Sequence, residues 1–325
     1  MTFRRTPGLI ALAISACLVA TSPAFTESYP ARPIKLVVPF PGGGTVDIVG
    51  RLVAQHVGAA LGQSIVVDNR PGAGTSIGLK AVATADPDGY TLLLGSTGSL
   101  AINPALYKNN DFAPVGNLVP IATVTTGANM LAVAASVPAT SVGELVALAK
   151  ANPGKLSHGA SLGTPPHLLG EFFRAKTGTD IVYVPYRGTS QAIPDVLAGR
   201  TQITAEGSAV LLPYIQQGTI RPIVIASAAR VPELPDVPTL IEAGLDGYPT
   251  ETWTGVVAPP GTPAAIVTTL NTAINDVLRS PEVQESLMKL GFRAKPGSPQ
   301  DFAALIAADM VKWADVVALT GARVD

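Results

Sequence analysis

The chain has 325 residues with 22 basic and 23 acidic side chains, giving a formal net charge of −1 at pH 7. A near-neutral chain without a basic run interleaved with aromatic residues is not expected to bind nucleic acid. Cys17 is the single cysteine, and the histidines are His56, His158 and His167. This composition predicts neither a disulfide framework nor a metal centre, and no cofactor is expected.

The N-terminus has the pattern of a secretory signal peptide. Arg4 and Arg5 precede an uncharged stretch over residues 8–20, which at a rise of about 1.5 Å per residue is too short to span a bilayer. Residues 1–24 are therefore predicted to be removed on export to the periplasm, leaving a net charge of 20 − 23 = −3 after the loss of two arginines. Cys17 also lies in a sequence that resembles a lipoprotein box, but the apolar residues after it favour a continuing signal segment over lipid anchoring.

Residues 34–47 combine a β-branched strand, the triplet Gly42-Gly43-Gly44 and the start of an amphipathic helix. Such glycines let the main chain turn with its N–H groups exposed, and the helix start adds unpaired N–H donors and the positive end of the helix dipole. The loop has neither the ending of a nucleotide P-loop nor the spacing of a dinucleotide fingerprint, so a small carboxylate is the favoured anion. The alternative is an ordinary connection in which Asp47 caps the helix.

Short β-branched runs alternate with helical patterns along the rest of the chain. The predicted strands are 34–38, 64–67, 90–94, 131–134, 155–159, 181–184, 202–205, 222–226 and 254–258. The predicted helices are 47–61, 141–150, 165–176, 189–198, 262–278 and 298–318. This alternation predicts an α/β protein with two lobes, each a doubly wound open sheet.

A series of short motifs runs through nearly the whole mature chain. They include Tyr29-Pro30-Ala31-Arg32-Pro33-Ile34, Asn69-Arg70-Pro71-Gly72-Ala73-Gly74, Pro87-Asp88-Gly89-Tyr90-Thr91-Leu92, Val184-Pro185-Tyr186-Arg187-Gly188 and Leu234-Pro235-Asp236-Val237-Pro238-Thr239. In this order the motifs resemble those of the solute-binding proteins of tripartite tricarboxylate transporters, also called the Bug family. Each motif is weak alone, but their shared order is a specific signal.

The resemblance implies a two-lobed periplasmic binding protein fold, type II-like, whose lobes are joined by two crossing strands. Lobe 1 would comprise residues 25–128 and 254–325, and lobe 2 residues 129–253. The ligand would be a small organic carboxylate in the cleft, held largely by main-chain N–H groups from a loop of each lobe.

The same resemblance locates most of the expected ligand-binding residues. The first-lobe loop corresponds to Phe40, Pro41, Gly42, Gly43, Gly44 and Thr45, and the second-lobe loop to Ser161, Gly163 and Thr164 ahead of His167. A third group is Gly188, Thr189 and Asp195, of which Asp195 would reach the ligand through water. Ser96 is added because it follows a predicted strand, whose carboxyl end should lie at the cleft rim.

Two of these assignments have plain alternatives. Ser96 also fits an ordinary Ser/Gly turn, and His167, in the first turn of a predicted helix, also fits a capping or packing role. The segment 159–163 satisfies Gly-x-Ser-x-Gly, so a serine hydrolase that uses Ser161 is a remote alternative. Chain order argues against it, because His167 follows Ser161 by six positions with no acidic residue between them.

These features together predict a monomeric protein without catalytic residues. It would capture a small carboxylate in the periplasm and deliver it to integral membrane subunits of a tripartite tricarboxylate-type transporter. A sensing subunit that presents its ligand to a signalling receptor would share the same binding chemistry and is an alternative. Main-chain donors recognise a carboxylate and not the group attached to it, so the sequence leaves the particular acid open.

Overall fold

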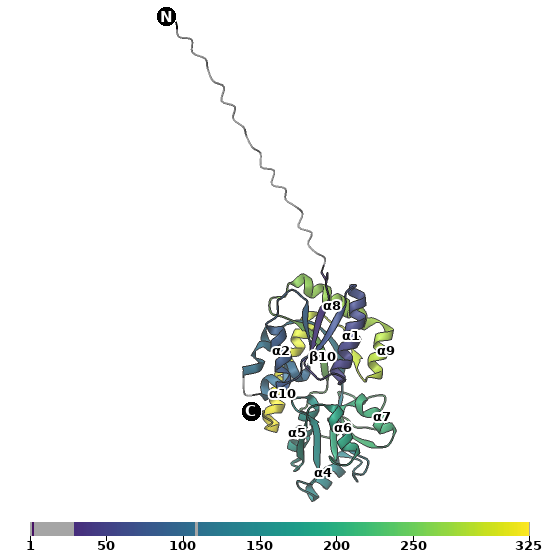
Figure 1. Ribbon diagram of the computed structural model, residues 1–325. Coiled ribbons are helices and arrows are strands. Elements are labelled where there is room, and N and C mark those ends of the chain that lie inside the picture. The colour runs from purple at the N-terminus through teal and green to yellow at the C-terminus, as the bar shows by residue number, and fades with distance from the viewer. Residues whose placement is uncertain (1, 3–28, 108–109, 325) are drawn as a thin grey trace.

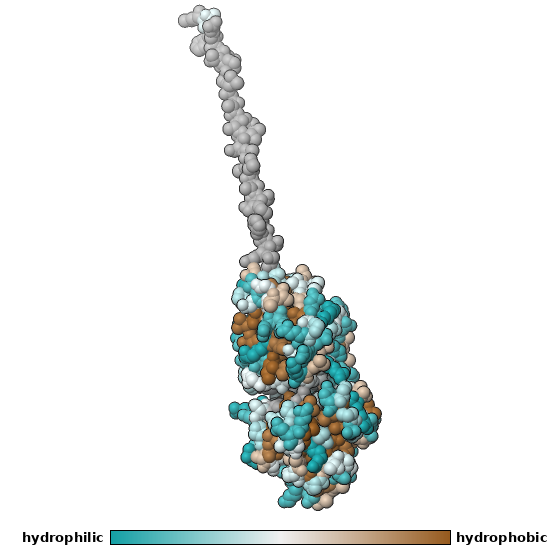
Figure 2. Space-filling view, turned by 90° about the vertical axis from the view of Figure 1, so that its right-hand side faces the viewer, coloured by the Kyte–Doolittle hydropathy of each residue, from teal (hydrophilic) through white to brown (hydrophobic). Residues whose placement is uncertain are grey.

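The computed structural model describes residue 2 and residues 29–107 and 110–324. These residues form two lobes that meet at a narrow waist (Figure 1). The space-filling view shows a largely hydrophilic surface with smaller hydrophobic areas on both lobes (Figure 2). Apart from residue 2, the predicted signal peptide lies outside the described residues, as does Cys17.

The first lobe is built on a six-stranded mixed sheet with the order β11-β4-β10-β3-β1-β2. Its strands are β1 (Ile34–Val38), β2 (Ile65–Asn69), β3 (Thr91–Ser96), β4 (Val119–Gly127), β10 (Thr252–Ala258) and β11 (Arg293–Ala294). β1 pairs in parallel with β2 and β3, whereas β10 is antiparallel to both β3 and β4. The carboxyl ends of β1, β2 and β3 therefore meet at one edge, which is where open α/β sheets bind ligands.

Helices cover this sheet, and α1 shows why they form. The helical segments of the lobe are α1 (Thr45–Leu61), η1 (Ala73–Thr75), α2 (Ser76–Ala83), η2 (Gly98–Ile102), α3 (Asn103–Leu106), η3 (Asn110–Asn117), α8 (Ala264–Arg279) and α9 (Pro281–Lys289). In α1, Val49, Val53 and Val57 recur every four residues and are buried on one face. Gly62 ends the helix in the left-handed conformation, with φ of 68°, which glycine adopts without strain.

The second lobe has a five-stranded mixed sheet with the order β7-β6-β8-β5-β9. Its strands are β5 (Asn129–Ala134), β6 (Ser157–Ser161), β7 (Val182–Tyr186), β8 (Ile203–Gly207) and β9 (Ile220–Ala226). Its helices are α4 (Val142–Ala151), α5 (Pro165–Thr177), α6 (Thr189–Leu197) and α7 (Ser208–Gln216). β6 is parallel to β7 and β8, and β5 is antiparallel to β8 and β9.

The chain passes between the two sheets twice. β4 ends at Gly127 and β5 begins at Asn129, so Ala128 links the two lobes directly. The return follows β9 and leads into β10, the strand at the centre of the first sheet. The first connection is therefore a single residue, whereas the return runs over residues 227–251.

The C-terminal helix α10 (Pro299–Thr320) packs on both lobes, against β4 in the first and α5 in the second. On α10, Trp313 meets Tyr248 edge-on with ring centroids 5.1 Å apart, and Tyr248 lies 5.2 Å from Phe172 of α5. Trp253 donates from Nε1 to Oδ2 of the buried Asp309 at 2.7 Å. A continuous apolar cluster therefore runs from one lobe into the other along α10.

The predicted fold class is confirmed, including the two α/β lobes and the two crossings between them. Both sheets carry antiparallel strands beside a parallel set, as the mixed pairing shows. The sequence interpretation missed β4, β11, α2, α3, α7 and α9. No helix among the described residues is long and apolar enough to cross a membrane.

Candidate functional site

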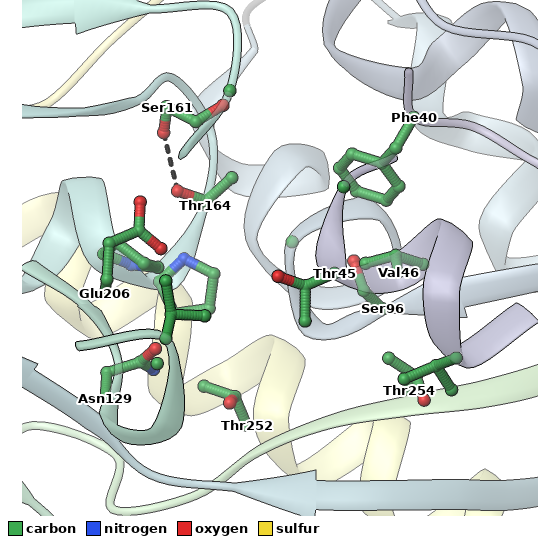
Figure 3. A pocket seen from close by; sticks show the side chains of 18 of the residues that line it. Phe40, Thr45, Val46, Ser96, Asn129, Ser161, Thr164, Glu206, Thr252 and Thr254 are labelled. Atoms are coloured by element: carbon green, nitrogen blue, oxygen red, sulfur yellow. Dashed lines mark hydrogen bonds between the residues drawn. The ribbon is translucent and has the colours of Figure 1, made fainter. Parts of the chain in front are cut away.

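A pocket of about 430 Å³ lies between the lobes. Figure 3 shows side chains of the first lobe, such as Phe40, Thr45 and Ser96, facing side chains of the second lobe, such as Ser161 and Glu206, across the open space. Both faces combine hydroxyl groups with apolar surface. A small polar molecule with a carbon skeleton fits such a lining.

The start of α1 supplies the first-lobe wall. Gly44 is the N-cap, in extended conformation, and the first bond of the helix runs from the Ile48 N–H to the Gly44 carbonyl at 3.0 Å. The N–H groups of Thr45 and Val46 precede that bond, and both residues line the pocket. The positive end of the α1 dipole therefore meets the pocket together with main-chain donors, which is the arrangement that binds anions.

A buried carboxylate holds this loop in shape. Asp47, only 2 % exposed, accepts from the Gly43 N–H at 2.8 Å and from Arg51 Nε at 2.9 Å through Oδ2. Its Oδ1 accepts from Asn69 Nδ2 at 2.9 Å, and the same Asn69 nitrogen donates to the Phe40 carbonyl at 3.1 Å. Asp47 is the third residue of α1, so the expectation of an Asp47 N-cap is wrong. Its role is to brace the glycine loop.

The pKa of Asp47 reflects this brace. Burial raises the pKa of the carboxyl group, but the hydrogen bonds from Arg51, the Gly43 N–H and Asn69 outweigh burial and hold the pKa below its usual value. Asp47 is therefore ionised at neutral pH and keeps the Gly43 N–H turned toward itself. Gly43 has φ of 80°, a conformation that only glycine adopts readily.

The second lobe presents a different helix start. Thr164 is the N-cap of α5, and Pro165 and Pro166 are its first two residues. Proline has no N–H, so two of the donors that a helix start usually offers are missing here. Ser161 and Thr164 line the pocket, and the Thr164 hydroxyl donates to the Ser161 carbonyl at 2.6 Å (Figure 3). The start of α5 therefore offers fewer helix N–H donors than the start of α1.

Main-chain donors of the second lobe come instead from the start of α6. Gly188 is the N-cap, and the N–H of Gln191 is the first to bond to its carbonyl, at 3.1 Å. Gly188 and Ser190 line the pocket beside Arg187. This edge can accept a second anionic or polar group of a ligand.

The floor of the pocket is formed where β10 meets β3. Thr97 bridges the main chain of Trp253, accepting from its N–H at 2.8 Å and donating to its carbonyl at 3.3 Å. Thr254 shares a hydrogen bond of 2.8 Å with Thr125. Thr97, Trp253 and Thr254 all line the pocket, so β10, which receives the chain from the second lobe, also forms part of its base.

Most of the predicted ligand residues come together at this pocket. Those that line it are Phe40, Pro41, Gly42, Gly44, Thr45, Ser96, Ser161, Thr164 and Gly188. Those that do not are Gly43, Gly163, His167 and Asp195. Thr189 is the first residue of α6.

Asp195 and Gly163 have other contacts. The Asp195 carboxylate accepts from the Tyr186 hydroxyl at 2.6 Å and from Arg200 Nε at 2.7 Å, and these two hydrogen bonds lower its pKa. A Cβ added to Gly163 would lie 2.6 Å from Oδ1 of Asn103, so Gly163 sits tightly against the first lobe. The water-mediated role of Asp195 stays a prediction.

His167 faces away from the ligand pocket. It lines a second, smaller cavity together with Glu171, Arg174 and Tyr183, and its ring centroid lies 4.3 Å from that of Tyr183. Burial lowers the pKa of His167 to about 4, so the side chain is neutral near pH 7. Since Ser161 and His167 line different cavities, the arrangement offers no serine–histidine pair for hydrolysis.

Several lining residues were not anticipated from the sequence. They are Asn129, Arg187, Gln191, Glu206, Thr252 and Phe292, among others. Glu206 directly follows the predicted strand 202–205, and the signal for it was available, since the carboxyl end of a parallel strand lies at the cleft. Phe292 follows α9, a helix that the sequence interpretation missed, so its position had no comparable signal. Among the described residues, no cluster of acidic, histidine or cysteine side chains could hold a metal ion.

The two lobes, the double crossing and the pocket between them define a two-lobed binding protein. The sequence matches the model of the "tripartite tricarboxylate transporter family receptor" over residues 49–321. It is also 36% identical over 318 residues to protein BugT of Bordetella pertussis, an alignment that covers 96% of this chain and 98% of BugT. The chain belongs to this family, which confirms the predicted resemblance and the prediction of a periplasmic-type solute-binding protein rather than an enzyme.

Solved structures agree with the assignment. A protein of R. palustris solved with adipate is similar with a TM-score of 0.85 and 37% identity, covering 91% of this chain and 100% of that one. MatC from Rhodopseudomonas palustris, solved with bound malate, is similar with a TM-score of 0.83 and 31% identity, covering 89% of this chain and 100% of that one.

Proposed function

We propose that this chain captures a small organic carboxylate in the periplasm and delivers it to the membrane subunits of a tripartite tricarboxylate-type transporter. The observation that carries the proposal is the start of α1, where the N–H groups of Thr45 and Val46 meet the pocket. A carboxylate at this point would accept main-chain hydrogen bonds and gain from the helix dipole.

The rest of the pocket supports the same ligand class. Phe40 and Phe292 offer apolar surface for a carbon skeleton, and the hydroxyl groups of Ser96 and Ser161 add donors from the two lobes. Relatives at 37% and 31% identity were solved with adipate and with malate, both of which are carboxylates. The proposal extends this chemistry to the present chain.

Delivery to membrane subunits and a monomeric state in solution complete the proposal. The family name associates its members with a tripartite transporter, and a binding protein of two lobes with a central hinge closes on its ligand by domain motion. Presentation of the ligand to a signalling receptor would use the same pocket and is the alternative.

A thermal-shift screen tests the binding step. The mature protein is heated with monocarboxylates, dicarboxylates, tricarboxylates, amino acids and neutral sugars. A ligand present at 100 times its dissociation constant stabilises the folded state by about 2.7 kcal/mol, which raises the midpoint by several degrees. We expect at least one carboxylate to do so. Stabilisation by neutral sugars alone would contradict the proposal.

Uptake tests the delivery step. Cells that lack the gene for this chain should lose uptake of the radiolabelled acid that binds the purified protein, and the wild-type gene should restore it. Normal uptake in the deletion strain, together with loss of a transcriptional response to the acid, would favour sensing instead.

A further inference from the structure

A second cavity, of about 280 Å³, lies outside the ligand pocket, between α5 and the residues that follow α10. A single water needs about 10 to 15 Å³, so the cavity has room for a small molecule together with water. Its lining includes His167, Glu171 and Arg174 of α5 and Arg323 of the C-terminal segment. The proposed capture of a carboxylate uses none of these side chains.

Both lobes bound this cavity, because the C-terminal segment is attached to the first lobe. The N–H of Val324 donates to the carbonyl of Leu106 at 3.1 Å, and Tyr107 forms a parallel bridge with Val324. Leu106 and Tyr107 lie at the end of α3, in the first lobe. Figure 1 shows the C-terminal end of α10, in yellow, beside α5 of the second lobe. A molecule in the cavity would therefore contact a segment held by the first lobe and a helix of the second.

The charges that line the cavity do not balance. Glu171 is 7 % exposed, and its Oε2 accepts from Nε and Nη2 of Arg174 at 3.2 and 2.6 Å. These bonds leave the Nη1 group of Arg174 to donate elsewhere. Arg323 is exposed and forms no ion pair with another described residue. A guanidinium group does not lose its proton in proteins, so the lining has positive charge in excess whether or not Glu171 is ionised.

His167 adds a polar group without a partner. It is 4 % exposed, and its Nδ1 has no hydrogen-bond partner among the described residues. Because burial lowers its pKa to about 4, the ring is neutral near pH 7 and has one donor and one acceptor nitrogen. Tyr183 is neutral as well, since burial and the nearby Glu171 raise the pKa of its hydroxyl group, which donates to the Ala160 carbonyl at 3.1 Å. A buried polar group without a partner is costly, so a molecule that hydrogen-bonds to His167 is favoured here.

We propose that this cavity binds a small inorganic oxyanion of the phosphate or sulfate type. Guanidinium groups form strong, charge-assisted hydrogen bonds with such anions. A tetrahedral oxyanion has enough oxygens to accept from Arg323, Arg174 and His167 together, whereas a carboxylate offers only two. The site is separate from the pocket proposed for the carboxylate and does not depend on the proposed function.

Calorimetry on the mature wild-type protein, without any carboxylate ligand, tests the site. Sodium sulfate and sodium phosphate are titrated at constant ionic strength, with sodium chloride as the reference. We expect saturable binding of at least one oxyanion with a dissociation constant of about 1 mM or lower. The absence of saturable binding by either oxyanion up to about 10 mM would overturn the inference.

Two variants of the lining separate this site from a general effect of salt on the protein. Arg323→Gln removes the charge of the C-terminal segment and should weaken oxyanion binding about tenfold or more. Arg279→Gln is the matched control, since Arg279 lies on α8 outside the cavity, paired with Asp276 at 3.2 Å, and should bind as the wild type does. Glu171→Gln cannot repel an anion and no longer pairs with Arg174 as a carboxylate, so it should bind the oxyanion as tightly as the wild type or more tightly.

The outcomes also separate this inference from the proposed function. Equal oxyanion affinities in Arg323→Gln and Arg279→Gln would mean adventitious binding elsewhere on the surface and would overturn the inference. Weaker binding in Glu171→Gln would overturn it as well. A carboxylate that binds while neither oxyanion does rejects the inference alone, whereas an oxyanion that binds through Arg323 supports it even if every carboxylate fails.

Discussion

The starts of α1 and α5 occupy equivalent places in the two lobes, yet they differ in chemistry. Each follows a parallel strand through a glycine-containing loop and borders the same pocket. α1 opens with Thr45 and Val46, whose N–H groups are available, whereas α5 opens with Pro165 and Pro166, which have none. The glycine pattern alone therefore does not make an anion site.

The supporting residues differ as well. Asp47 braces the α1 loop through the Gly43 N–H and Asn69, so a buried carboxylate behind the loop fixes the donors in front of it. At α5 the Thr164 hydroxyl is occupied by the Ser161 carbonyl. The main-chain donors at the start of α1 are therefore held from behind by a carboxylate, whereas the polar groups at the start of α5 bond to one another.

The largest expected effect comes from Gly43→Val, which disturbs the glycine loop that precedes the main-chain donors of α1. Gly43 has φ of 80°, and a β-branched residue there forces the loop to change. Losing two main-chain hydrogen bonds to a carboxylate, at about 1.5 to 3 kcal/mol each, should weaken binding about a hundredfold or more by calorimetry.

Gly62→Val is the control for this change. Gly62 has φ of 68° at the other end of the same helix, and an added Cβ there meets no atom within 4 Å, as at Gly43. Gly62→Val should lower the free energy of unfolding by about as much as Gly43→Val does, but its affinity for the ligand should equal that of the wild type. Equal ligand affinities in the two variants would mean that the α1 loop does not contribute to ligand binding.

Ser161→Ala removes a hydroxyl group from the second-lobe wall. If this hydroxyl bonds to the charged ligand, affinity should fall by about 1.5 to 3 kcal/mol, while the thermal midpoint of the free protein stays close to that of the wild type. Ser157→Ala, at the other end of β6, is the matched control and should bind normally. Unchanged affinity in Ser161→Ala would place the second-lobe contacts elsewhere.

Asp47→Ala tests whether the main-chain donors at the start of α1 depend on the hydrogen bonds that Asp47 accepts behind the loop. The change leaves the Gly43 N–H and Asn69 without their carboxylate partner, and urea denaturation should show a loss of about 1.5 to 3 kcal/mol. Arg51 is more than half exposed, so its ion pair adds little to this figure. Ligand affinity should fall about tenfold, because the donors are less well ordered.

Asp301→Ala provides the comparison for that variant. Asp301 is also the third residue of its helix, α10, where it completes a capping box with Ser298. Asp301→Ala should lower the free energy of unfolding by about 1 kcal/mol and leave the affinity for the ligand unchanged. The brace hypothesis is wrong if Asp47→Ala and Asp301→Ala have equal effects on affinity.

The second lobe should also respond to acid through two buried histidines. Burial lowers the pKa of His158 to about 3, with a further lowering from the nearby His167, whose own pKa is about 4 because of burial. The unfolded chain, with histidine pKa near 6.5, binds more protons below that pH, so stability falls as pH drops from 6.5 toward 4.

Urea denaturation between pH 6.5 and 5 measures this loss, because most carboxylates titrate at lower pH. Each histidine should contribute a slope approaching about 1.4 kcal/mol per pH unit. His158→Phe should make the dependence shallower. The same slope in this variant and in the wild type would mean that His158 takes up its proton in the folded state.

The smallest expected effect comes from giving α5 a donor that it lacks. Pro165→Ala restores an N–H at the first position of the helix, so affinity for a plain dicarboxylate such as adipate should rise by about 0.5 to 1 kcal/mol. Pro281→Ala at the first position of α9 is the control and should not change affinity. No gain in Pro165→Ala would mean that the α5 start plays no part in anion binding even with its donor present.

Much of the fold and part of the site could be predicted from the sequence. The α1 junction was readable because the β-branched strand, the glycines and the helical period each carry a local signal. β4 was missed although residues 121–126 are β-branched or small and buried, since Pro120 near its start argues against a strand. α7 was missed for a similar reason, because Pro213 lies inside the helix. α9 was missed although Pro281 at its first position suits a helix start.

Residues whose role depends on the approach of the two lobes were the hardest to predict. Asn129 and Thr252 line the pocket only because the crossing strands bring them there. His167 and Gly163 were expected at the ligand, yet the turn of the helix directs His167 into a second cavity and Gly163 contacts Asn103 of the other lobe. Local patterns do not encode these long-range placements.

A crystal structure of the mature protein with its tightest-binding acid tests the central claim most directly. The account predicts a ligand carboxylate oxygen within about 2.7 to 3.1 Å of the main-chain nitrogen of Thr45 or Val46, on the axis of α1. A ligand bound between the lobes with its carboxylate at the start of α5, or with no contact to the start of α1, would contradict the account.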